Sequence, residues 1–216
     1  PMTQLRAVAS LHPVALQVVT LERSGIRRID DLRGRRVALG GPGSATRPIA
    51  RRVLAAHGLG EDAIDARDLE PEIALERLAA GKLDAFFALG AVPLDAVARV
   101  AAIAEIRLLP VSAARLADDP AVAGTTVAAS IPAGAYMGVP EAETLAMPVQ
   151  LLVGEDLGED LVYAMTVRLW APGTRQRLGA AVPMAGDMTL EGALDGLEAP
   201  LHPGAARFYR DRGLLP

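Results

Sequence analysis

The fold is decided by residues 36–46, which read RVALGGPGSAT: a short apolar strand, a glycine-rich loop and the start of a helix. Apolar residues recur after this loop with the spacing of one helical face, as far as His57. His57 in the last turn and Gly58 directly behind it are typical of a helix C-terminus. The stretch is therefore predicted to be one strand–loop–helix unit of an α/β protein.

The same alternation continues on both sides of this unit. Strands are predicted at residues 16–19, 84–89 and 106–111, and helices at residues 71–80 and 95–104. Their order predicts a parallel sheet with helices on its faces. Further along, we predict strands at 125–131 and 147–153, a loop at 132–143, and helices at 159–170, 189–197 and 203–212.

Composition limits the classes of function. The chain has 216 residues, of which 51% are hydrophobic, so it forms one large domain or two small ones. The absence of cysteine excludes disulfides, thiolate metal sites and a cysteine nucleophile. A net charge of −4 and an aromatic content of 3% argue against nucleic acid as a partner. The three histidines lie far apart without metal-ligand spacing, so no metal or cofactor is expected.

No membrane span or export signal is evident in the sequence. The longest uncharged stretch, residues 121–140, contains glycine, proline and hydroxyl residues, a composition of loops and strands. The first residues, PMTQ, are not a basic segment followed by an apolar core. Three interpretations stay open: a cytoplasmic protein, a protein whose signal was removed, and a part of a longer protein.

The glycine-rich loop is the strongest candidate for a binding site. Gly40, Gly41 and Gly43 allow the backbone to approach a ligand closely. Ser44 and Thr46 add hydroxyl groups next to the free N–H groups at the start of a helix, an arrangement that suits a carboxylate or phosphate. The loop lacks the lysine of a phosphate-binding P-loop, which argues against nucleotide triphosphatase chemistry. The alternative interpretation is a plain strand-to-helix turn with a hydroxyl cap.

Two further segments are candidates. Gly90 and Ala91 follow a buried strand, and ligands of open parallel sheets bind beyond the carboxyl ends of the strands. The alternative there is a plain helix entry with Pro93 near its first position. Tyr136, in a loop rich in glycine and proline, has a hydroxyl that can cover a pocket, although it can also pack on its own loop. No acid, base or nucleophile can be assigned, so we expect a protein that is not an enzyme.

Several segments recur in the order and spacing of one family, across nearly the whole chain. They are residues 5–13 (LRAVASLHP), 24–26 (SGI), 31–40 (DLRGRRVALG), 42–46 (PGSAT), 81–87 (GKLDAFF), 106–110 (IRLLP), 131–134 (IPAG) with Tyr136 and Gly138, and 201–205 (LHPGA) with Phe208, Tyr209, Gly213 and Leu214. With these segments the chain resembles the solute-binding proteins of TAXI-type TRAP transporters.

The resemblance implies a type II periplasmic-binding-protein fold: two doubly wound α/β lobes, joined by two hinge strands. It implies capture of a small organic anion, such as a dicarboxylate or a glutamate-like amino acid, in the interlobe cleft. The ligand would pass to the membrane permease subunits of a TRAP transporter, and the protein would be periplasmic. The implied ligand-binding residues are Pro42, Gly43, Ser44, Ala45, Thr46, Gly90, Ala91 and Tyr136.

The chain departs from the family pattern in four respects. The stretch of residues 12–15 (HPVA) lacks an acidic residue that is common there. Family members usually carry glycine where Ala45 stands and proline where Met137 stands. They also have a further segment before the equivalent of Leu5, so the resemblance predicts that the first lobe is incomplete here. Residues 1–20 would be the hinge and a remnant of lobe 1, residues 21–144 a complete ligand-binding lobe 2, and residues 145–216 the return strand and C-terminal helices of lobe 1.

An incomplete lobe would leave apolar sheet surface exposed. A missing N-terminal segment or a second copy of the chain is the partner expected to cover it. Two other classes of function stay open. One is a sensory or scaffold domain that uses the fold without transport. The other, an enzyme such as a transferase, is less favoured because no catalytic residues can be assigned.

Overall fold

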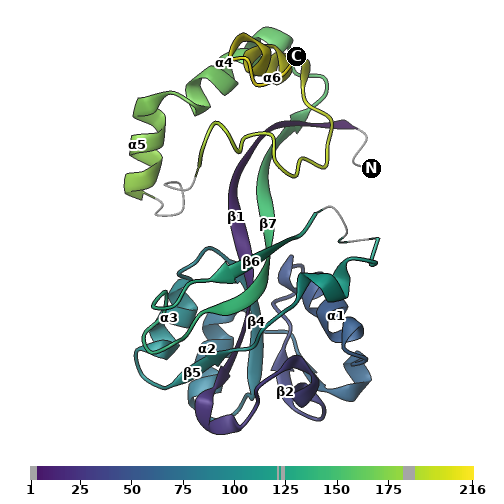
Figure 1. The fold of residues 1–216 in the computed structure, drawn as a ribbon, viewed down its shortest axis with the longest axis vertical. Helices are drawn as coiled ribbons and strands as arrows, with labels where there is room; N and C mark the ends of the chain where they lie inside the picture. Colours follow the sequence, from purple (N-terminus) through teal and green to yellow (C-terminus); the bar gives the residue numbers. More distant parts are fainter. Residues whose placement is uncertain (1–3, 121, 123–124, 182–187) are drawn as a thin grey trace. The chain divides into compact units, whose positions relative to one another are not determined.

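The computed structural model describes residues 4–120, 122, 125–181 and 188–216, and Figure 1 shows the course of the chain. The chain divides into two compact units. One unit is Val14–Ala146, and the other combines Pro1–Pro13 with Met147–Pro216. The chain passes from one unit to the other inside two long strands, β1 (Leu5–Leu21) and β7 (Ala142–Gly154), which are neighbours in the sheet.

The sheet of the Val14–Ala146 unit has a short parallel part. Strand β2 (Arg36–Ala38) lies between β3 (Asp65–Arg67) and β4 (Ala85–Gly90), and it is parallel to both. Val37 in β2 is fully buried, as are the residues of β4 that it faces. This parallel arrangement of β2, β3 and β4 is the one predicted from the strand–loop–helix unit that begins at residues 36–46.

The prediction of an all-parallel sheet is wrong beyond these three strands. Strand β1 runs antiparallel to β4 and to β5 (Ile106–Leu108), with Val19 opposite both Phe86 and Leu108. The strand β6 (Val127–Ile131) is likewise antiparallel to β7. Alternation of strands and helices does not fix the direction of a strand that enters the sheet from elsewhere in the chain, which is the reason for the error.

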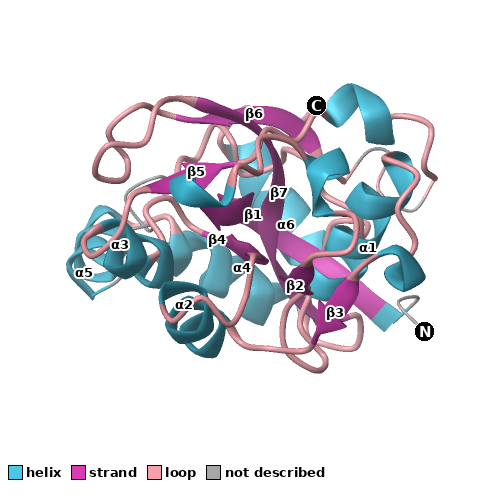
Figure 2. Cartoon of the chain, turned by 90° about the horizontal axis from the view of Figure 1, so that it is seen from below, coloured by secondary structure: helices cyan, strands magenta, loops and turns pink. Residues whose placement is uncertain are grey.

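Three α-helices cover the two faces of this sheet (Figures 1 and 2). They are α1 (Thr46–Ala56), α2 (Pro71–Ala79) and α3 (Asp95–Ala101). Helices α2 and α3 lie on one face and α1 on the other. Leu78 of α2 and Val97 of α3 pack on Phe86 of β4 in a core without solvent exposure. Short 3-10 helices connect these elements at Glu22–Ser24, Ile29–Leu32, Glu61–Ala63 and Ala113–Leu116.

The other unit packs helices against the outer parts of β1 and β7. Its helices are α4 (Glu159–Leu169), α5 (Pro172–Ala181) and α6 (Pro203–Asp211). Gly204 allows α6 to approach α4, because a Cβ atom at this position would overlap the backbone of α4. The Tyr209 hydroxyl donates a hydrogen bond to the Val8 carbonyl (2.9 Å) and accepts one from Trp170 (3.1 Å). Burial raises the pKa of Tyr209 to about 12.

The predicted helix at residues 189–197 is wrong, since residues 191–196 form turns. Gly192 and Gly196 explain this, because glycine weakens helices and Gly196 adopts a positive φ of 62°. Helix α5, in contrast, was not predicted, because its residues are mainly small and polar and show no apolar face.

Candidate functional site

Two of the predicted segments meet at one edge of the sheet, which we call the loop edge. The glycine loop (residues 39–45) follows β2, and the second loop (residues 91–94) follows β4. Because β2 and β4 are parallel, both loops leave the sheet at the same edge. Ala15 of β1 lies opposite Gly90, so β1 also crosses to the other unit from this edge. The structure thus brings the segment Pro42–Thr46 to the same edge as Gly90 and Ala91.

The glycine loop closes tightly on itself. Gly40 has a φ of 107°, and a Cβ atom there would lie 2.5 Å from the Ser44 Oγ atom and 2.8 Å from the Thr46 Cβ atom. Gly43 has a φ of 76° with open space around it. The Ser44 N–H donates a hydrogen bond to the Gly41 carbonyl (3.1 Å) and completes the turn. Glycine is therefore required at position 40 for both its conformation and its size.

Unsatisfied polar groups gather where the loop enters α1. The residue before α1, Ala45, provides no side-chain cap for the N–H groups of Thr46 and Arg47, the first two residues of the helix. The Ser44 Oγ atom is buried without a hydrogen-bond partner. Thr46 is buried at 7% exposure, while Pro42, Gly43 and Ala45 are exposed. Exposed loop residues thus lie beside an unpaired hydroxyl at the positive end of a helix.

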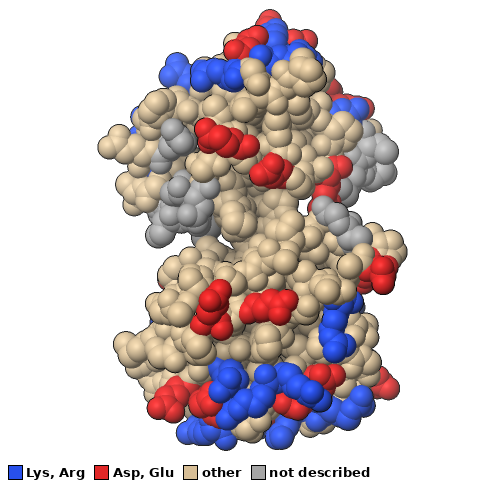
Figure 3. Space-filling model, in the orientation of Figure 1, with Lys and Arg blue, Asp and Glu red and all other residues tan. Residues whose placement is uncertain are grey.

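The nearby cation is already compensated. Arg47 forms ion pairs with Asp68 and, at 3.9 Å, with Glu61. The Glu70 carboxylate occupies the space that a side chain at Gly41 would fill. Figure 3 shows Lys and Arg side chains gathered over the lower end of this unit, where β1 ends. An anion at the glycine loop would therefore depend on backbone N–H groups rather than on a basic side chain.

Tyr136 lies against the second loop rather than against the glycine loop. It is only 2% exposed, and its hydroxyl accepts a hydrogen bond from the Leu94 N–H (2.7 Å) and donates one to Gln17 Oε1 (2.5 Å). Gln17 in turn donates from Nε2 to the Ala91 carbonyl (3.1 Å). Burial is the main cause that raises the pKa of Tyr136. These bonds fix the conformation of the second loop from two sides.

Gln17 and Glu70 are the residues that the sequence-based reasoning missed. Gln17 stands inside the apolar strand of residues 16–19, and a polar side chain in a predicted buried run was an available signal. Glu70 directly precedes α2 and gives no such signal, because acidic residues are common before helices.

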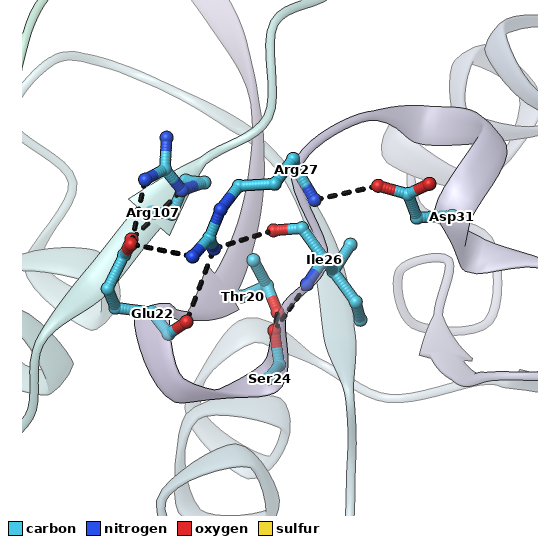
Figure 4. Close-up of polar contacts among 7 residues, drawn as sticks. All are labelled: Thr20, Glu22, Ser24, Ile26, Arg27, Asp31 and Arg107. Carbon is cyan, nitrogen blue, oxygen red and sulfur yellow. Dashed lines mark hydrogen bonds and ion pairs between the residues drawn. The ribbon is translucent and has the colours of Figure 1, made fainter.

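The opposite end of the same sheet is saturated with polar contacts (Figure 4). Arg107 binds Glu22 through two bonds of 2.9 and 2.7 Å, and this contact lowers the pKa of Glu22. Arg27 adds an ion pair to Glu22 at 3.0 Å. The Ser24 hydroxyl contacts the Thr20 hydroxyl and accepts from the Ile26 N–H (3.1 Å). This end, which we call the turn end, presents a structural network.

Metal binding and membrane spanning find no support in the part of the chain that the structure describes. It contains no group of three or more His, Asp or Glu residues that could hold a metal ion. None of its helices is both long and apolar enough to cross a membrane.

The chain is similar to several solved structures. A putative periplasmic sulfonate-binding protein SsuA from Methylobacillus flagellatus KT has a TM-score of 0.51 and 12% identity, and the match covers 98% of this chain and 63% of that chain. The aliphatic sulphonate-binding SsuA from Escherichia coli has a TM-score of 0.48 and 15% identity, with 97% and 66% covered. SsuA from Xanthomonas axonopodis pv. citri, bound to MOPS, has a TM-score of 0.47 and 17% identity, with 99% and 70% covered.

The first of these structures shows that the chain has a mixed α/β fold of the periplasmic-binding-protein type. The chain spans about two thirds of the length of these structures. The sequence of the chain matches one protein family over residues 1–213, which is nearly its whole length. The protein therefore belongs to the NMT1-like family.

Proposed function

We propose that the protein is the solute-binding component of a membrane transport system and that it captures a small organic anion at the glycine loop. The observation that carries this proposal is the buried, unpaired Ser44 hydroxyl beside the uncapped start of α1. A buried polar group without a partner is costly, and a ligand that binds it removes that cost.

The chemistry of this loop favours an oxyanion. Carboxylate and sulfonate oxygens accept hydrogen bonds from helix N-terminal N–H groups and from hydroxyls, and the positive helix end stabilises their charge. The exposed Gly43 permits close approach of the ligand to the backbone. The proposed ligand-binding residues are Pro42, Gly43, Ser44, Ala45, Thr46, Gly90, Ala91 and Tyr136. Tyr136 contributes through the second loop, whose Leu94 N–H it binds.

We propose a dicarboxylate or a glutamate-like amino acid as ligand, as the resemblance to TAXI-type proteins implies. The partners would then be the permease subunits of a TRAP transporter, and the protein would act in the periplasm without a cofactor or a catalytic step. The similarity in fold to an SsuA of a sulfonate ABC transporter adds small sulfonates to the ligands that deserve testing. In this proposal residues 21–144 are the ligand-binding lobe, and residues 1–20 and 145–216 belong to the other lobe.

The test is isothermal titration calorimetry with succinate, glutamate and taurine. We expect at least one of them to bind, and Ser44→Ala to weaken that binding about tenfold, since it removes one hydrogen bond to a charged group. Ser24→Ala is the matched control, because Ser24 lies at the turn end and its hydroxyl is already bonded. Absence of binding by all three compounds, or equal weakening by both variants, would contradict the proposal.

A further inference from the structure

A second surface of the Val14–Ala146 unit lies away from the loop edge, between α2 and α3. Both helices are joined to β4 by short connections, α2 before it and α3 after it, so both run antiparallel to β4 and parallel to each other. They lie side by side on one face of the sheet (Figure 2). Their outer sides border a groove of about 600 Å³.

The groove has an apolar floor and a projecting apolar rim. Ala79, the last residue of α2, and Ala80 line one side, and Ala102 and Ile103, directly after α3, line the other. Ile103 is 71% exposed, which is the second-highest exposure among the large hydrophobic residues of the described chain. Small residues on one wall and a large exposed one on the other form a hole and a knob.

One charged residue stands on each wall. Glu76 lines the groove from α2 and Arg99 lines it from α3, and both are exposed. Neither forms an ion pair among the described residues. Glu76 lies three residues before the end of α2 at Ala79, and Arg99 lies two residues before the end of α3 at Ala101, so both charges stand near the C-terminal ends of their parallel helices.

This pattern is self-complementary, and we propose that the groove is the interface of a symmetric dimer of this chain. A two-fold axis parallel to the groove places α2 of each copy over α3 of the other. Glu76 of one copy then faces Arg99 of the second copy, and the reciprocal pair forms at the same time. Ile103 meets Ala79 and Ala80 of the second copy, so each knob enters the opposite hole. Such an isologous contact uses one patch twice and closes at two copies.

The dimer is expected to be weak. Stable interfaces bury about 1,200–2,000 Å² in total, and weak or transient contacts bury less. The groove lies between helices of only nine and seven residues. We therefore expect association at protein concentrations of about 0.1 mM, with the two reciprocal ion pairs setting the orientation more than the affinity.

The experiment is sedimentation equilibrium of the whole chain and two charge-reversal variants, Glu76→Arg and Arg99→Glu. We expect wild type to dimerise with rising concentration and each variant alone to stay monomeric, because each places like charges opposite one another at both pairs. An equimolar mixture of the two variants should dimerise again, since one copy then carries only arginine and the other only glutamate at these positions. Circular dichroism melting checks that each variant folds as wild type does.

Only a two-fold contact that pairs residue 76 of one copy with residue 99 of the other predicts that dimerisation returns in the mixture. A wild-type chain that stays monomeric up to 0.5 mM, about five times the expected concentration, would overturn the proposal and leave the groove to a different partner. Dimerisation that survives both single variants would also overturn it, because the contact would then lie elsewhere. As a further check, Ile103→Asp should abolish association without a change in melting temperature, since Ile103 is exposed in the single copy.

Discussion

The loop edge and the turn end belong to the same sheet of the Val14–Ala146 unit and are built in opposite ways. At the turn end, Glu22 is bound by two arginines, and Asp84 accepts three hydrogen bonds of 2.8–2.9 Å from Arg36. At the loop edge, α1 begins without a side-chain cap, and the Ser44 hydroxyl has no partner. The carboxylates of Glu22 and Asp84 are thus fully engaged at the turn end, whereas the glycine loop leaves the Ser44 hydroxyl without a partner.

We expect the turn end to contribute to the stability of the fold, and the glycine loop at the loop edge to contribute to ligand binding. Ion pairs and capped turns at the turn end hold β1, β4 and β5 in register and need nothing from outside. Uncapped N–H groups at the loop edge cost stability unless water or a ligand satisfies them. Substitutions in the ion pairs of the turn end should therefore change stability alone, whereas those in the glycine loop should change binding.

The largest expected effect is at Gly40. Gly40→Val forces a branched side chain into a φ of 107° and against Ser44 and Thr46, so the glycine loop cannot keep its conformation. We expect a loss of ligand affinity of at least about 100-fold. Calorimetry with the ligand found for wild type measures it, and Gly25→Val, at a glycine with open space and a φ of 75° at the turn end, is the control. Equal losses for both variants would contradict the separation of the two ends.

The second effect concerns the bonds behind the second loop. Tyr136→Phe leaves Gln17 Oε1 and the Leu94 N–H without a partner in a buried region, and it should lower the free energy of unfolding by about 2 kcal/mol. Urea unfolding measures the change. A variant as stable as wild type would show that these bonds do not hold the second loop.

The third effect depends on pH. Hydrogen bonds from Arg36 lower the pKa of Asp84 below its ordinary value of 3.8. The stability from this contact is complete above that value and is lost as the pH falls through the lowered pKa. Asp84→Asn should reduce the melting temperature by about 3 °C at pH 7, and the difference from wild type should shrink below pH 4. A difference that is constant from pH 7 to pH 2 would contradict this account.

The smallest expected effect is at Arg47. Because Asp68 and Glu61 already compensate its charge, Arg47→Gln should weaken anion binding less than about threefold. Calorimetry at low and high salt measures this. A loss above tenfold, together with strong salt dependence, would assign the anion contact to the side chain instead of the backbone.

The elements with strong apolar periods were predictable, and those fixed by distant contacts were not. The predicted helix at 46–57 is α1, and the predicted strand at 84–89 is β4, displaced by one residue. Strand β3 carries charged residues on exposed positions, so it shows no apolar pattern. Strand β1 extends back to Leu5 through Pro13, a residue that disfavours strands in sequence-based reasoning.

At the candidate site, too, the sequence predicts only what depends on neighbouring residues. The glycine spacing and the hydroxyls predict where the loop lies, since these depend on neighbouring residues. The bond from Tyr136 to Gln17 joins residues 119 positions apart, and the burial of the Ser44 hydroxyl depends on the packing around it. Such facts follow from the tertiary structure, which local patterns do not determine.

Amide chemical-shift mapping by NMR tests the central claim most directly. The ¹⁵N-labelled whole chain is titrated with succinate, glutamate and taurine. We predict that at least one compound shifts the amides of Gly43 to Arg47 and of Ala91, while the amides of Glu22 to Arg28 stay unchanged. Shifts confined to Glu22 to Arg28, or no shifts with any of the three compounds, would contradict the assignment of the loop edge as the binding end.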